Sequence, residues 1–325
     1  MQLQQLRYVV ALADERHFTR AAKRLHVAQP SLSSQIRALE FELGTELFER
    51  SRRGVSLTTA GEQFLPWARQ ALADCEAGRE AVRELLGLQR GRLAIGATPS
   101  LTTGLLPPLL AAFRGHYPGV ELLLRQAGSR DLVASLEEGE LDLALVILPV
   151  RAPRVVARAL AEEELVLAVP SRHPLAGRPS ITVKDLRGLP LVGFREGYDL
   201  REATIAACRA AGFEPTLALE GGEMDGVLAL TAGGLGAAVV PLTALRGMSG
   251  LVAIRFAGGM PRRTIGLAHS SDRPRPRAAA AFEDILYTAL SEGGWPGVPV
   301  GGIRLADLNT ASGASDFSAA PQSAR

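Results

Sequence analysis

Apolar side chains recur every three or four positions through the first 45 residues, a pattern that predicts three successive helices. The apolar positions are Leu3, Leu6, Val10 and Ala13 in the first helix (residues 3–14), Phe18, Ala21, Ala22 and Leu25 in the second, and Leu32, Ile36, Leu39 and Leu43 in the third. Pro30 suits the first turn of the third helix, where its missing N–H would have no partner. Two helices joined by a short turn, the second with an outward polar face, indicate a helix-turn-helix over about residues 18–37.

Small and polar side chains occupy the outward face of the third helix. Such groups can exchange hydrogen bonds with base edges, and the major groove of DNA admits one helix. The side chains in question are those of Gln29, Ser31, Ser33, Ser34, Gln35 and Arg37. A basic turn follows within residues 49–58 and suits a wing that grips phosphates. A plain three-helix bundle with a solvated polar face is the alternative interpretation of the same pattern.

Residues 59–89 form one long helical segment whose small and apolar side chains alternate in steps of four and three, as in a seam for a partner helix. The seam comprises Phe64, Ala68, Ala71, Cys75, Gly78, Val82 and Leu85. Packing of this helix against the chain's own domain is the alternative. Within the seam, Cys75 is expected to be a small buried residue and not a bridge between subunits.

From residue 91 onward, runs typical of strands alternate with helical runs, which predicts parallel sheets in an α/β architecture. Strands are expected over 93–97, 120–124, 143–148, 165–169, 191–194, 217–219, 237–240 and 265–268, and helices over 105–113, 132–136, 200–211, 227–230 and 277–291. The segment that begins at Gly128 has a gap-free echo that begins at Gly222, so two related subdomains are expected. They are residues 90–160 plus 266–292, and residues 161–265. Residues 293–325, rich in Gly, Ser, Ala and Pro, predict a disordered tail.

Helix starts that follow strands are the expected binding positions in this part of the chain. Ligands of such sheets bind outside the carboxyl ends of the strands, and the N–H groups at helix N-termini attract anions. The candidate cleft residues are Thr98, Ser100, Ser129, Leu148, Tyr198, Leu200 and Met224. Ser100 and Ser129 are expected to hydrogen-bond a carboxylate or a similar group. Each residue taken singly is as easily explained as a helix cap.

Composition and charge narrow the class of protein. The chain has 325 residues, enough for two or three domains, and no apolar run long enough for a membrane span. Its N-terminus lacks the features of a signal peptide, and its two cysteines suggest no disulfide framework, so a reducing cytoplasm is expected. The net charge of the chain is +2. Residues 1–58 carry nine Lys and Arg against six acidic residues, so this segment is modestly basic.

Motifs for catalysis are missing from the sequence. The five histidines have no metal-ligand spacing, there is neither a Cys-x-x-Cys nor a phosphate-binding loop, and the glycines of residues 233–236 lack the dinucleotide pattern. No enzyme activity, no metal and no cofactor are therefore expected. A cytoplasmic small-molecule-binding protein without a role in DNA regulation is the alternative to a regulator.

The spacing of residues 16–64 resembles the LysR-type transcriptional regulator family. The matching positions are Ala21-Ala22, Leu25, Gln29-Pro30, Leu32-Ser33, Gln35-Ile36, Leu39-Glu40, Leu43-Gly44, Leu47-Phe48-Glu49-Arg50 and Leu57-Thr58-x-Ala60-Gly61. The segments LLPPLL, YPGVEL, EGELDLAL and AGGLGAAVVP resemble the same family, so the resemblance covers about residues 1–292. It implies a winged helix-turn-helix (1–58), a linker and dimerisation helix (59–89) and a two-subdomain, periplasmic-binding-protein-like (type 2) effector domain (90–292).

The resemblance also implies partners and site residues. The partners would be double-stranded promoter DNA, a small-molecule effector near Ser100 and Ser129, a homodimer or homotetramer, and RNA polymerase if the protein is an activator; no membrane is involved. The implied DNA contacts, completed by Thr19, are Gln29, Pro30, Ser31, Ser33, Ser34, Gln35 and Arg37, with Arg50, Arg52 and Arg53 on the wing. The segment GYDLREATIAACRAAGF resembles the peroxide-sensing branch, but Asp199 stands where the reactive cysteine would be. A switch based on that thiol is therefore not expected.

Overall fold

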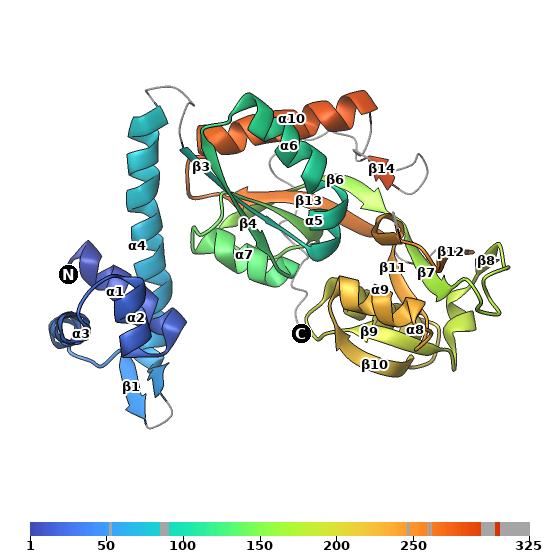
Figure 1. Cartoon of the computed structure of the whole chain (residues 1–325), viewed down its shortest axis with the longest axis horizontal. Coiled ribbons are helices and arrows are strands. Elements are labelled where there is room, and N and C mark those ends of the chain that lie inside the picture. The colour runs from blue at the N-terminus through green and yellow to red at the C-terminus, as the bar shows by residue number, and fades with distance from the viewer. Residues whose placement is uncertain are drawn as a thin grey trace, which may run out of the picture.

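The computed structural model describes residues 1–51, 54–84, 91–245, 248–258, 260, 262–293 and 303–305. The chain forms a small helical head, one long helix (α4, Thr59–Glu84) and a larger α/β part with two lobes (Figure 1). The helix α4 stands between the head and the first lobe, and it contacts both. No helix in the described part of the chain combines the length and apolarity that a membrane span needs.

The head contains the three helices that the sequence predicts and a short hairpin. Its elements are α1 (Leu3–Glu15), α2 (Phe18–Arg24), α3 (Gln29–Leu43), β1 (Phe48–Ser51) and β2 (Gly54–Leu57), and the two strands pair antiparallel. Leu12, Leu32 and Ile36 are fully buried, because the apolar faces of the helices meet in one core. The Glu40 carboxylate accepts hydrogen bonds from the backbone N–H groups of Leu47 (2.9 Å) and Phe48, which ties α3 to the hairpin.

The start of α4 is fixed by a cap and a close backbone approach. The Thr58 hydroxyl accepts from the Gly61 N–H at 3.0 Å and donates to the Glu46 carbonyl at 2.7 Å. A Cβ atom at Gly61 would lie 2.1 Å from the Leu47 carbonyl oxygen, so any larger residue would force the backbone apart.

Replacing Gly61 with alanine should therefore destabilise the head by about 2 kcal/mol, since the backbone on both sides of the contact must shift. Gly78→Ala is the matched control, because a Cβ at Gly78 meets nothing within 4 Å and alanine favours helix by about 1 kcal/mol over glycine. Thermal unfolding of both variants checks the prediction. Equal melting temperatures in the two variants would contradict it.

The residues of the predicted seam on α4 differ in their exposure along the helix. Phe64 and Leu65 pack against the core of the chain's own head, which was the alternative prediction, and Ala68 on the same helix is 1% exposed. Further along the helix, Val82 is 65% exposed. The prediction that Cys75 is buried is wrong for the single chain, because this part of α4 extends beyond the head and Cys75 is exposed there. Leu85 lies outside the described residues.

Lobe I is built on a six-stranded sheet with the order β14-β6-β13-β5-β3-β4. Its elements are β3 (Gly91–Ala97), α5 (Pro99–Gly104), α6 (Leu106–His116), β4 (Val120–Gln126), α7 (Ser129–Glu137), β5 (Leu143–Leu148), β6 (Val155–Glu163), β13 (Arg263–Ser270), α10 (Arg277–Gly293) and β14 (Ile303–Leu305). α5, α6 and α10 share a core with one face of the sheet, and α7 covers the other face (Figure 1). The helix predicted over 105–113 is confirmed as α6, which begins at Leu106 directly after α5 and continues to His116.

Lobe II contains a four-stranded sheet, β11-β7-β12-β8, and a parallel pair, β9 and β10. Its elements are β7 (Leu165–Pro170), β8 (Ser180–Ile181), η1 (Val183–Leu186), β9 (Pro190–Phe194), α8 (Asp199–Ala210), β10 (Thr216–Gly222), α9 (Met224–Ala232), β11 (Ala238–Pro241), η2 (Leu242–Leu245) and β12 (Leu251–Phe256). The predicted echo corresponds to α7 in lobe I and α9 in lobe II.

The prediction of parallel sheets is confirmed for β3 with its neighbours β4 and β5 and for the pair β9 and β10, but it is wrong for the antiparallel pairs of the two larger sheets. The chain crosses between the lobes twice, and the strands flanking the crossings, β6 and β13, pair antiparallel with each other, as β13 does with β5. In lobe II, β11 and β12 both run antiparallel to β7. The prediction of a disordered tail is wrong for residues 303–305, because β14 pairs with β6; the rest of 294–325 lies outside the described residues.

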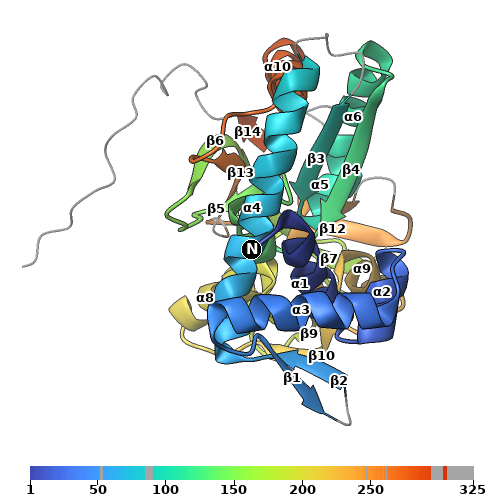
Figure 2. The same ribbon diagram turned by 90° about the vertical axis from the view of Figure 1, so that its left-hand side faces the viewer.

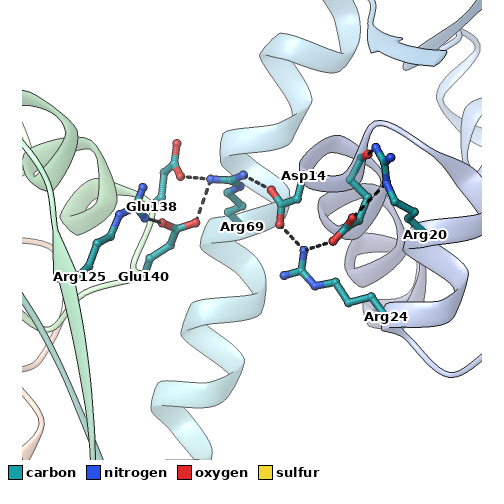
Figure 3. Close-up of polar contacts among 8 residues, drawn as sticks. Asp14, Arg20, Arg24, Arg69, Arg125, Glu138 and Glu140 are labelled. Carbon is teal, nitrogen blue, oxygen red and sulfur yellow. Dashed lines mark hydrogen bonds and ion pairs between the residues drawn. The ribbon is translucent and has the colours of Figure 1, made fainter. Parts of the chain in front are cut away.

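One arginine connects all three parts of the molecule (Figure 3). From α4, Arg69 bonds to Asp14 of α1 at 2.7 Å, to Glu138 at the C-cap of α7 at 2.5 Å, and to Glu140 at 2.9 Å. Arg125 of β4 also binds Glu140. We call Arg69 and its three carboxylate partners the Arg69 cluster. It holds the head and lobe I against opposite sides of α4.

Candidate DNA interface and effector cleft

The outward face of α3 carries most of the predicted DNA contacts. An open hollow of about 330 Å³ on this face is lined by Gln29, Pro30, Ser33, Ser34 and Arg37. Thr19, Gln29, Pro30, Ser31, Ser34 and Arg37 are exposed, and Gln35 is half-buried. Ser33 also lines the hollow, but it is only 5% exposed, so it is less accessible than the sequence predicts. The exposed members offer donors and acceptors on one helix face.

The β1–β2 hairpin lies beside this face, in the position of a wing (Figure 2). The Val55 N–H donates to the Arg16 carbonyl at 3.1 Å, which holds the hairpin to the turn between α1 and α2. Gly54, with a φ of 127°, permits this approach. Of the predicted wing residues, Arg50 lies on β1 with its side chain outside the described residues, and Arg52 and Arg53 lie outside them altogether.

In the α/β part, Ser129 joins the two lobes. It is the first residue of α7, and its hydroxyl donates to Oδ2 of Asp199, the first residue of α8, at 2.8 Å. The same hydroxyl accepts from the backbone N–H of Ile147 at 3.0 Å. The loops before the two helices also touch, since a Cβ at Gly128 would lie 3.4 Å from the Gly197 carbonyl oxygen.

The electrostatic environment of Asp199 is mixed. Burial raises the pKa of the Asp199 carboxyl above its ordinary value. Hydrogen bonds from Ser129 and the positive charge of the nearby Arg263 guanidinium lower this pKa, but they offset only part of the effect of burial. Burial is also the main reason that the pKa of Tyr198 is raised. The ionised form of Asp199 is therefore poorly stabilised where it lies.

Ser100 belongs to a second, buried polar group at the crossing strands. Its hydroxyl accepts from Nη2 of Arg263 at 2.8 Å, and Nε of Arg263 donates to the Glu163 carboxylate at 2.6 Å. The Thr243 hydroxyl from lobe II donates to the same carboxylate. Glu163 is 0% exposed, and its charge is compensated by Arg263, as a buried ion requires.

A cavity of about 230 Å³ lies between the lobes beside these two groups. Its lining residues are Ile147, Leu148, Pro149, Leu165, Asp199, Leu200, Glu202, Ala203, Arg262 and Arg263. Leu148 and Leu200 were predicted to line the cleft. Ser100 and Ser129 do not line the cavity themselves, but their hydrogen-bond partners Arg263 and Asp199 do. The site is thus an apolar pocket with charged groups from both lobes, the usual composition of a small-molecule site.

The other predicted cleft residues are buried near the same junction. Thr98 stands at the N-cap position of α5 without a side-chain cap hydrogen bond, Tyr198 stacks on Phe194 with 4.7 Å between ring centroids, and Met224 begins α9. Within the described part of the chain, the hydroxyls of Thr98 and Tyr198 are buried without a hydrogen-bond partner. None of these three residues lines the cavity.

Sequence reasoning missed Glu163 and Arg263 as site residues. They lie 100 residues apart, and no local pattern relates them. Their only sequence signal is that each is a charged residue next to an apolar strand run. Cys208, expected to be core, is buried on α8, and burial raises the pKa of its thiol, so the reactive thiolate is disfavoured.

Comparison with known proteins agrees with the division of the chain into a helix-turn-helix head and an α/β part. Residues 3–62 match the family model described as bacterial regulatory helix-turn-helix protein, lysR family, and residues 86–291 match that of the LysR substrate binding domain. The transcriptional dual regulator GltC of Bacillus subtilis is 34% identical over 295 residues, which cover 90% of this chain and 98% of GltC.

Two solved structures extend the likeness to the whole architecture. Full-length OxyR C199D from Pseudomonas aeruginosa has a TM-score of 0.69 and 31% identity, covering 88% of this chain and 94% of that one. Full-length CbnR in complex with its target DNA has a TM-score of 0.66 and 28% identity, and the match covers 89% of this chain and 100% of the CbnR chain. The helix-turn-helix match argues against the alternative of a small-molecule binder without a regulatory role. The chain belongs to the LysR family, and it is a DNA-binding transcription regulator with an effector-binding domain.

Proposed function

We propose that this regulator binds a small carboxylate-bearing effector in the cavity between its lobes and reads promoter DNA with α3 and the wing. The observation that carries the effector site is the cavity of about 230 Å³ bordered by Asp199 from lobe II and by Ile147 and Leu148 from lobe I. Such an effector would contact both lobes, so its binding would favour one arrangement of them over others. Arg262, which is exposed and lines the cavity, would bind the carboxylate first, and the buried Ser100 hydroxyl behind Arg263 would complete the site.

The assembly and the cellular setting follow from the same arrangement. The exposed part of α4, with Trp67 and Val82, is a surface for a second copy, so that two α3 helices would face a two-fold-symmetric site. We expect a homodimer or a homotetramer acting in the cytoplasm, where its DNA is, and a contact with RNA polymerase if it activates. No step of this function requires catalysis.

The effector site is tested by thermal unfolding of the full chain with a panel of small mono- and dicarboxylates. A carboxylate present at 100 times its Kd should stabilise the native protein by roughly 2.7 kcal/mol, and Ser100→Ala and Ser129→Ala should each lose most of that gain. Ser135→Ala is the matched control, because this α7 serine faces the core and bonds only to the Asp131 carbonyl. Full stabilisation in both site variants would remove the two serines from the site.

A further inference from the structure

The Ser129 hydroxyl has no proton left for a ligand. A serine hydroxyl has one hydrogen to donate, and that of Ser129 goes to the Asp199 carboxylate at 2.8 Å. One of its acceptor positions is taken by the Ile147 N–H at 3.0 Å. An incoming carboxylate has only acceptor oxygens, so it can bond to this hydroxyl only after Asp199 has left it.

Ser100 differs from Ser129 in this respect. Its hydroxyl accepts from Arg263, and no acceptor for its own proton is present in the described part of the chain. The Ser100 hydroxyl therefore keeps its proton for an effector that reaches it, although Ser100 is only 1% exposed and does not itself line the cavity. The two serines that the sequence places in equivalent roles thus have opposite states: one free to donate, the other already bound to a carboxylate of the protein.

Asp199 has the chemistry of the ligand that the cleft is expected to take. It presents a carboxylate to Ser129, lines the cavity, and comes from the opposite lobe. Its charge would also repel a second carboxylate nearby, because the closest buried cation, Arg263, is already paired with Glu163. While Asp199 is seated, the Ser129 position is closed to anions by both hydrogen bonding and charge.

We propose that Asp199 is a built-in occupant of the carboxylate position at Ser129, and that an effector carboxylate binds there by displacing it. The displacement breaks a direct hydrogen bond between α7 of lobe I and α8 of lobe II, so ligand binding and the arrangement of the lobes are coupled through one residue. Only the identity of the incoming ligand rests on the function proposed above. Asp199 thereby lowers the apparent affinity of the cleft, because only the fraction of molecules with Asp199 unseated can bind.

The direct test is to remove the Asp199 carboxylate and return it as a free molecule. Thermal unfolding of full-length Asp199→Ala is followed in sodium formate and, at equal concentrations, in sodium chloride. We expect the variant to melt several degrees below the native protein, and formate to restore at least half of that loss with a saturable dose response. Chloride should not restore it, and the double variant Asp199→Ala/Ser129→Ala should not respond to formate.

A formate response of the same size in the native protein, the single variant and the double variant would overturn the proposal, as would an Asp199→Ala variant that responds no better to formate than to chloride. If Asp199→Ala does not fold, Asp199→Asn keeps an acceptor for Ser129 and removes the charge. This variant should bind acetate at least tenfold more tightly than the native protein in calorimetric titrations. Equal affinities, or binding by neither protein, would count against the proposal.

The outcomes separate this inference from the proposed function. If formate rescues Asp199→Ala but no carboxylate stabilises the native protein through Ser100 and Ser129, Asp199 occupies the Ser129 position as proposed here. The effector is then not a carboxylate, and the function proposed above is rejected. A carboxylate that stabilises the native protein and Asp199→Ala with the same Kd would keep the effector site and reject the occupant.

Discussion

Replacing Arg37 with alanine should weaken binding to the DNA upstream of the regulator's own gene by about 30-fold or more at constant salt, since each of two subunits loses one base contact worth about 1–3 kcal/mol. Arg37 is exposed beside Gln29 and Ser34 on the outward face of α3, and no carboxylate pairs with it within the described residues. Its guanidinium is therefore free to meet an acceptor in the major groove. Electrophoretic mobility shifts at several salt concentrations measure the change.

Arg7→Ala is the matched control for Arg37→Ala. Arg7 is exposed on α1, away from the hollow on α3, so this variant removes the same charge from the head without removing the proposed base contact. A lost phosphate contact should lower the slope of log affinity against log salt by about 1, whereas a lost base contact should leave the slope nearly unchanged. Identical affinities of the two variants at every salt concentration would show that α3 does not read the DNA through Arg37.

Arg69→Met should loosen the junction between head, α4 and lobe I and reduce the free energy of unfolding by about 2 kcal/mol. The substitution keeps much of the side-chain volume but removes the cation from Glu138, and it leaves Asp14 and Glu140 only their exposed partners Arg24 and Arg125. Arg69 is 19% exposed, so solvent screens this cluster less than a surface ion pair. Chemical denaturation and limited proteolysis of the segment after α4 measure the effect.

The control for this prediction is Arg79→Met. Arg79 lies on the same helix, and its ion-pair partner among the described residues is Glu76 one turn away, at 3.2 Å, with both side chains more than half exposed. Its loss should change stability by less than about 0.5 kcal/mol. If the two variants are equally stable and equally resistant to protease, the Arg69 cluster does not hold the parts together.

The Arg69 cluster also lies at the far end of the helix that enters the cleft. α7 begins with Ser129, which contacts Asp199, and its C-cap residue Glu138 contacts Arg69, which in turn binds Asp14 of the head. A movement of α7 caused by displacement of Asp199 would therefore reach α1 through side chains in direct contact. Arg69→Met should accordingly reduce the effect of any effector on DNA binding.

The head and the first half of the chain were largely readable from the sequence because their signals are local. Helical periodicity located α1, α2 and α3, Pro30 marked the first turn of α3, and the glycine-containing turn marked the hairpin. These features depend on residues within about ten positions of one another. Burial of Ser33 and the division of the α4 seam were not readable, since both depend on what α3 and α4 pack against.

The cleft shows the opposite case. Ser129 and Asp199 are 70 residues apart, Glu163 and Arg263 are 100 apart, and Ser100 and Arg263 are 163 apart. Strand and helix spacing identified the serines as helix starts near the cleft. It did not show that each already has a partner of its own, because those partners arrive from the other lobe or from a crossing strand.

By itself, the amino-acid sequence determined the helix-turn-helix, the long linking helix, the two related α/β lobes and the family, since periodicity, turn residues and short motifs act over a few neighbouring positions. Only the tertiary structure decided the antiparallel crossing strands, the Arg69 cluster and the closed state of the Ser129 position. The physical reason is distance along the chain: hydrogen bonds and ion pairs form between groups that folding brings within about 3 Å, and a linear pattern carries no record of which distant charge will be the neighbour.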